Sequence, residues 1–176
     1  MEFSFYLHPK KYLASKKCSG GIIRGERGNH IISFSHYPGT GNVILAELWA
    51  LQIEVHLAIN QGIQNLEIES DSNSAVQLMN DNNLPNTSNF FNVISNCKCL
   101  LLSLKQWKIS HCYREANRCA AALANHGKTS KLHLSIHQEP PPFLFTHLLH
   151  DEQSYHLPRQ VPTPHSNNID NELEPP

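Results

Sequence analysis

Residues 43–72 place a long apolar helix directly before a strand, and this pairing most constrains how the chain can fold. Apolar side chains recur there at intervals of three and four, which defines one helical face: Ile44, Leu48, Leu51, Val55 and Ala58. Gly62 follows this pattern and can end the helix in a left-handed conformation. Residues 66–69, Leu-Glu-Ile-Glu, then alternate with the period of a strand. The segment predicts a layered domain in which a buried helix packs beside a sheet.

Two carboxylates stand out within this segment. Glu47 lies in the otherwise apolar part of the helix, and Asp71 lies where the strand hands over to the next helix. Strand ends of this kind are common ligand positions in layered α/β domains, and carboxylate oxygens are the ligands that Mg²⁺ prefers. Each residue also has a plain structural interpretation. Glu47 could be a surface residue at the helix edge, and Asp71 could be an N-cap.

The chain before this segment predicts strands. In residues 1–17, Phe3, Phe5 and Leu7 alternate with polar neighbours, which suits a short strand that Pro9 ends. Residues 19–24 and 30–37 read as the two arms of a hairpin, with a glycine in its turn. The pattern contributes three strands ahead of the first helix.

The chain after Asp71 predicts three helices and one strand. Residues 74–79 follow the cap residues directly, and a later helix carries the apolar stripe Phe90, Ile94, Cys97, Leu101 and Leu104. Residues 107–113 alternate as a strand, and residues 115–125 form the last helix, with Gly127 as its C-terminal cap. This order suits an α/β fold with a mixed sheet and helices on its faces.

Residues 128–176 differ in kind from the rest. They hold eight of the 11 prolines, with His, Gln, Asn and Glu between them. Such a composition buries too little apolar surface to offset the entropy of ordering the chain. We expect a disordered, proline- and histidine-rich tail.

Composition narrows the classes of function. The formal net charge of −1 argues against a broad cationic surface, so any nucleic-acid contact must come from a local patch. The five cysteines are an odd number and follow no secretory leader, which predicts reduced thiols and a cytoplasmic or nuclear location. No apolar run approaches the roughly 20 residues that span a bilayer, so we expect no membrane partner.

Four separated blocks resemble the ribonuclease H-like domains of plants, of the reverse-transcriptase-associated type. They run in family order from about residue 18 to 127: Gly20-Gly21-Ile22-Ile23-Arg24, Ala46-Glu47-Leu48-Trp49-Ala50-Leu51, Glu69-Ser70-Asp71-Ser72, and His111 through Ala120. The resemblance implies a ribonuclease H-like fold over residues 18–127. Residues 1–17 are atypical and could replace the first strand.

The resemblance also implies a chemistry, cleavage of the RNA strand of an RNA–DNA hybrid with two Mg²⁺ ions. Ions held about 3.5–4 Å apart need several carboxylates to offset their mutual repulsion, and the family supplies four. Glu47 and Asp71 match the second and third. The fourth falls on Ala121, and the stretch near Leu7 holds no acid for the first. We expect Mg²⁺ to be held weakly and cleavage to be impaired or lost.

Binding could outlast cleavage. Arg114, Asn117 and Arg118 cluster at the start of the last helix, where phosphate is favoured, although they could equally be a solvated face. The partner implied by the resemblance is an RNA–DNA hybrid or double-stranded RNA, while any protein partner is unknown. Two alternatives stay open on the same fold, a non-catalytic protein-interaction module and a truncated retroelement remnant.

Overall fold

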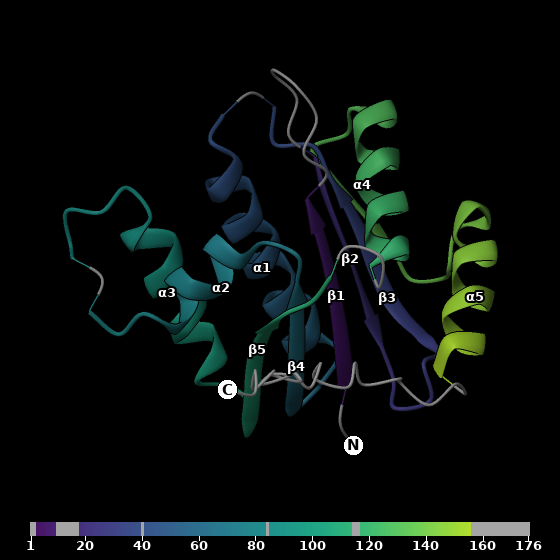
Figure 1. Ribbon diagram of the computed structural model, residues 1–176, viewed down its shortest axis with the longest axis horizontal. Coiled ribbons are helices and arrows are strands. Elements are labelled where there is room, and N and C mark those ends of the chain that lie inside the picture. The colour runs from purple at the N-terminus through teal and green to yellow at the C-terminus, as the bar shows by residue number, and fades with distance from the viewer. Residues whose placement is uncertain (1–2, 10–17, 40, 84, 114–116, 156–176) are drawn as a thin grey trace, which may run out of the picture.

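The computed structural model describes residues 3–9, 18–39, 41–83, 85–113 and 117–155 as six strands and five α-helices (Figure 1). The elements in chain order are β1 (Phe3–Pro9), β2 (Ser19–Arg24), β3 (His30–His36), α1 (Val43–Asn60), β4 (Asn65–Ser70), α2 (Asn73–Asn80), α3 (Phe91–Leu101), β5 (Gln106–His111), α4 (Arg118–Ser130), β6 (Leu134–His137), the 3₁₀ turn η2 (Pro142–Leu144) and α5 (Phe145–Tyr155). The predicted α/β class is confirmed.

The six strands form one mixed sheet in the order β5-β4-β1-β2-β3-β6. The pairs β1–β2, β2–β3 and β3–β6 are antiparallel, whereas β1–β4 and β4–β5 are parallel. The short strand predicted to end at Pro9 is therefore present, and it lies in the middle of the sheet. Its register places Leu7 beside Ser70, the residue before Asp71.

Helices cover both faces of the sheet. A Cβ added at Gly21 would meet Glu54 of α1, whereas a Cβ added at Gly20 would meet Leu123 of α4. Adjacent strand residues point to opposite faces, so α1 and α4 lie on opposite sides. Figure 1 shows α2 and α3 gathered beside α1, and α5 beside α4.

Helix α1 is the central core element. Asn42 caps its start by accepting a hydrogen bond from the Ile44 amide at 2.9 Å, and Gly62 ends it with φ +71°. It is also the one helix in the described part of the chain that is long and apolar enough to cross a membrane. Half of that window is buried inside the fold, which explains its composition by core packing.

Helix α4 differs from its prediction in both bounds. It runs from Arg118 to Ser130, and Lys131 ends it in the left-handed conformation with φ 55°. Gly127 is an interior residue of this helix, and a Cβ added there would lie 3.1–3.3 Å from backbone atoms of His36. Glycine at this position therefore allows α4 to approach β3 closely, and it is not the C-terminal cap of the helix.

The expectation of a disordered tail is wrong for residues 128–155, which form the end of α4 followed by β6, η2 and α5. Leu144 of η2 is fully buried in a cluster with Ile22, Cys119 and Leu123. His126 of α4 also stacks on Phe143, with ring centroids 4.8 Å apart. The apolar residues among the prolines thus complete the α4 side of the core. Residues 156–176 lie outside the described part of the chain.

Candidate functional site

The two candidate carboxylates belong to segments that meet at the carboxyl end of β4. Asp71 follows β4 directly, and the next residue, Ser72, donates a hydrogen bond from Oγ to Glu47 Oε2 on α1. Glu47 is 7% exposed and Asp71 is half-buried. A hydrogen bond between residues 25 positions apart in the sequence therefore links α1 to the loop that contains Asp71.

Hydrogen bonds hold the loop around Asp71 in place. The Ser70 hydroxyl accepts from the Ser72 amide at 3.1 Å, and the Ser72 hydroxyl accepts from the Ala75 amide at 3.3 Å. Ser72 thus caps α2 while it donates to Glu47, so both roles of its hydroxyl are filled. Because the serines on both sides are fixed, the backbone position of Asp71 is fixed as well.

Cys112 lies at the neighbouring strand end. Its amide donates to the Ser70 carbonyl at 2.9 Å. Burial, together with the charges of Glu69 and Asp71, raises the pKa of the Cys112 thiol to about 12. A thiol that stays protonated at neutral pH is a poor nucleophile, so this cysteine does not suit nucleophilic catalysis.

The predicted residues of α4 occupy different environments. Asn117 is fully buried, which does not fit a surface contact with nucleic acid, whereas Arg118 is exposed. Ala121, one helical turn after Asn117, donates its amide to the Asn117 carbonyl at 3.2 Å. Arg114 lies outside the described residues. Of the two residues of the predicted cluster that the structure describes, Asn117 and Arg118, only Arg118 is therefore exposed to a ligand.

The donor chemistry near Asp71 suits a hard cation, but few ligands gather there. Glu47 and Asp71 offer carboxylate oxygens of the type that Mg²⁺ takes. Across the described residues, no three side chains of His, Cys, Asp or Glu are grouped so that they could hold a metal ion. The residues present thus fit one loosely held ion better than a pair.

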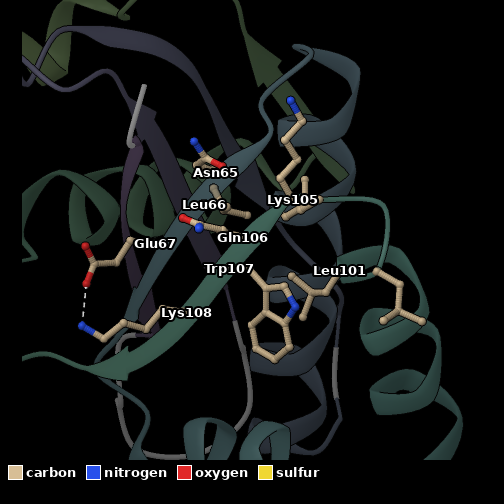
Figure 2. Close-up of a pocket in the computed structure, with 10 residues that line it drawn as sticks. Asn65, Leu66, Glu67, Leu101, Lys105, Gln106, Trp107 and Lys108 are labelled. Atoms are coloured by element: carbon tan, nitrogen blue, oxygen red, sulfur yellow. Dashed lines mark hydrogen bonds and ion pairs between the residues drawn. The ribbon is translucent and has the colours of Figure 1, made fainter.

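A groove lies elsewhere on the sheet. It has a volume of about 710 Å³ and is lined by residues that include Asn65, Gln106 and Trp107, at the opposite end of β4 and β5 from Asp71 (Figure 2). The Lys108–Glu67 ion pair at 2.9 Å borders it. Its position separates this groove from the candidate carboxylates.

A second buried glutamate was missed by the sequence prediction. Glu54 of α1 is 0% exposed, and neither of its carboxyl oxygens has a hydrogen-bond partner among the described residues. Burial raises the pKa of the Glu54 carboxyl well above its ordinary value. Glu54 lies within the apolar stripe between Leu51 and Val55, and an acid at such a position is the signal that could have found it.

The fold defines a class of protein. A ribonuclease H1 from Halobacterium salinarum superposes with a TM-score of 0.67 at 20% identity, over 74% of this chain and 99% of that chain. The N-terminal ribonuclease H domain of a Mycobacterium tuberculosis protein follows with a TM-score of 0.66 at 14% identity, over 73% and 94%. A ribonuclease H1 named LC11, solved in complex with an RNA/DNA hybrid, gives 0.63 at 19%, over 71% and 95%. The chain therefore has the ribonuclease H fold, as predicted.

Sequence comparison gives the family. The pattern of the "Reverse transcriptase-like" family matches residues 13–127, and the chain belongs to that family. A relative from Arabidopsis thaliana, whose name assigns it provisionally to ribonuclease H, is 28% identical over 145 residues. That match covers 81% of this chain, which spans only 23% of the length of the relative.

Proposed function

We propose that this chain is a nucleic-acid-binding ribonuclease H-like domain whose Mg²⁺-dependent cleavage of RNA–DNA hybrids is impaired or lost. The observation that carries the proposal is the pairing of Glu47 with the Asp71 loop through Ser72, in a site with too few acids. Two carboxylates can hold one hard cation weakly. A two-ion arrangement needs more negative charge close by.

Two backbone positions support this proposal. Leu7 of β1 pairs beside Ser70, next to Asp71, and Ala121 lies on α4 at the position that corresponds to the family's fourth acid. By the resemblance, an acid at either place would supply one of the two carboxylates that this chain lacks. We therefore attribute the proposed loss of activity to the lack of an acid at residues 7 and 121.

Magnesium binding tests the retained half of the site. Titration calorimetry should detect one weak Mg²⁺ ion on the unaltered chain, and Glu47→Gln or Asp71→Asn should abolish it. Glu67→Gln is the matched control, because Glu67 lies on β4 but pairs with Lys108. Equal binding by all four proteins would exclude the role of Glu47 and Asp71.

Restoring the missing acids tests the lost half. A chain with both Leu7→Asp and Ala121→Asp should cut a labelled RNA–DNA hybrid in Mg²⁺, and adding Glu47→Gln should remove that activity. The unaltered chain should cut far more slowly, since residues of such a site act as a unit. Efficient cutting by the unaltered chain that disappears in Glu47→Ala would overturn the proposed loss.

Binding is tested separately from cleavage. Fluorescence anisotropy with a labelled RNA–DNA hybrid or double-stranded RNA should show weak affinity that falls steeply with salt. Arg118→Ala should weaken this binding, because Arg118 is exposed at the start of α4. Affinity that does not change with salt would contradict a phosphate contact.

A non-catalytic interaction module is the second candidate, and it is favoured by the same shortage of acids. Protein binding without any affinity for hybrid or double-stranded RNA would support it. A cooperative thermal melt would argue against a retroelement remnant with no stable product. For location we propose the cytoplasm or nucleus, supported by five free cysteines.

A further inference from the structure

The side chain of Asn117 is a buried polar group whose hydrogen-bonding capacity is unused in the described part of the chain. The residue is 0% exposed, and neither its Oδ1 nor its Nδ2 atom has a hydrogen-bond partner among the described residues. A buried amide in this condition costs free energy, and native proteins usually satisfy such a group with protein, water or an ion. The Asn117 side chain therefore requires an explanation in terms of what it binds.

Helix capping does not supply that explanation. Asn117 precedes α4 directly, at the position where asparagine is a favoured cap, yet its side chain makes no capping hydrogen bond. Asn42 and Ser72 occupy the same position before α1 and α2, and each accepts a hydrogen bond from an amide of its helix. The Asn117 amide is therefore free for another role at the start of α4.

Cys112 shows that Asn117 and Asp71 lie in the same neighbourhood. Burial and the charges of Glu69 and Asp71 raise the pKa of the Cys112 thiol, whereas the side-chain amide of Asn117 acts on that pKa in the opposite direction. Both groups therefore lie close to the Cys112 thiol. The amide of Cys112 also donates to the Ser70 carbonyl at 2.9 Å, which holds this neighbourhood against the loop of Asp71.

Asn117 also lies on the side of α4 from which the family's fourth acid would act. It precedes Ala121 by four residues, and its carbonyl accepts from the Ala121 amide at 3.2 Å. Residues one turn apart lie on the same side of a helix. An oxygen of Asn117 would therefore approach the carboxylates from the side on which Ala121 offers none.

We propose that Oδ1 of Asn117 is the third protein ligand of a single divalent cation held by Glu47 and Asp71. The inference rests on the proposed function, because it takes these two carboxylates as the cation site. Amide and carboxylate oxygens both suit Mg²⁺ and Mn²⁺, and water can fill the remaining coordination positions. An amide adds a ligand without adding charge, so it helps to hold one ion but does not offset the repulsion between two.

Titration calorimetry with Mg²⁺ on the full chain tests the ligand. Asn117→Leu removes the oxygen at similar size and should weaken binding at least ~10-fold. Asn117→Asp keeps an oxygen and adds a charge, so it should bind Mg²⁺ more tightly than the unaltered chain. Asn125→Leu is the matched control, because Asn125 is exposed on the same helix. A purely structural role of Asn117 would not make the aspartate variant bind more tightly.

Nuclear magnetic resonance with Mn²⁺ reports on the side chain of Asn117 directly. In a ¹⁵N-labelled chain, substoichiometric Mn²⁺ should broaden the side-chain amide signal of Asn117 before that of Asn125. The signal is assigned by its absence from the spectrum of Asn117→Leu, or by its loss in Asn117→Asp if the leucine variant does not fold. Circular dichroism checks the folding of each variant.

The outcomes separate this inference from the proposed function. Mg²⁺ binding that Glu47→Gln abolishes, but that both Asn117 variants leave unchanged, would overturn the role of Asn117 and leave the two carboxylates as the site. An Asn117 signal that Mn²⁺ does not broaden while it binds would overturn that role as well. Absence of Mg²⁺ binding by the unaltered chain would overturn both the inference and the retained cation site on which it rests.

Discussion

Glu47 and Glu54 lie seven residues apart on α1, two turns along the same face, yet their surroundings differ completely. Glu47 is 7% exposed at the rim of the sheet and accepts a hydrogen bond from Ser72. Glu54 is 0% exposed under Gly21 and Phe34, with no hydrogen-bond partner for its carboxyl oxygens in the described residues.

The difference separates a carboxyl group that has a hydrogen-bond partner from one that has none among the described residues. A partnered carboxylate at a rim can stay charged and offer oxygens to a cation. A sealed carboxyl without a partner loses its hydration, which costs about 1–3 kcal/mol even when it is neutral. We therefore expect the two glutamates of this helix to contribute differently to the free energy of unfolding.

The largest expected effect concerns pH and Glu54. Its folded pKa is raised, so the folded chain keeps a proton that the unfolded chain releases above its ordinary pKa. The stability associated with this group is fully present below the unfolded pKa and is lost as pH rises toward the folded pKa. The loss reaches about 1.4 kcal/mol for each pH unit in that window. Glu54→Gln removes this loss, so we expect it to stabilise the chain increasingly at higher pH.

Urea unfolding of both proteins across pH measures this effect. The difference between the two curves is the relevant quantity, because other groups also contribute to each curve. Burial, with smaller contributions from neighbouring charges, lowers the pKa values of His30 and His36 to about 4, so their contribution is lost as pH falls. Glu47→Gln serves as the matched control. A difference between the Glu54→Gln and unaltered curves that is constant with pH would contradict a raised pKa of Glu54.

The next effect tests the space around Glu54. An alanine Cβ at position 21 would clash with Glu54 Oε1 and would lie 2.5 Å from the Phe34 ring. Gly21→Ala should therefore lower the free energy of unfolding by about 2–3 kcal/mol, since overpacking a sealed core forces side chains aside. Adding Glu54→Ala should recover part of that loss. Gly41→Ala is the control, because nothing lies within 4 Å of its added Cβ.

A smaller effect is expected at the partner of Glu47. Ser72→Ala removes both the cap of α2 and the hydrogen bond to Glu47, and should cost about 1–2 kcal/mol in denaturant unfolding. Ser72→Thr keeps a hydroxyl and should cost less. If the two variants lose the same stability, the hydroxyl is not what holds the two segments together.

The smallest effect is expected from Glu47→Gln itself. Glutamine keeps an oxygen that accepts from Ser72, so the free energy of unfolding at neutral pH should change by less than ~1 kcal/mol. Its consequence should be confined to Mg²⁺ binding. A stabilisation as large as that of Glu54→Gln would mean that Glu47 is also a neutral core group, and the comparison between them would fail.

The sequence predicts the periodic elements well and the contacts between them poorly. The α1 stripe and the alternation of β4 were found because each buries one regular face. Strand β6 has only four residues, and η2 begins beside consecutive prolines, so neither produces a periodic signal. For the segment that contains these two elements, composition was the only signal in the sequence, and it indicated disorder.

The candidate site was predictable only in part. A resemblance to known domains singled out Glu47 and Asp71, and the cap signal identified residues 70–73 as a helix start. The bond from Ser72 to Glu47 joins residues 25 apart, and no local spacing encodes such a contact. The burial of Asn117 could not be predicted from the sequence either, because it depends on how α4 packs against the sheet.

The position of Leu144 has a consequence for where this domain ends. The family match stops at residue 127, inside α4, whereas Leu144 completes the cluster around Ile22 and Leu123. A chain cut at that match would expose an apolar hollow and shorten α4 by its last turn. The smallest fragment that can be expected to fold by itself therefore extends past η2, beyond the residue at which the family match ends.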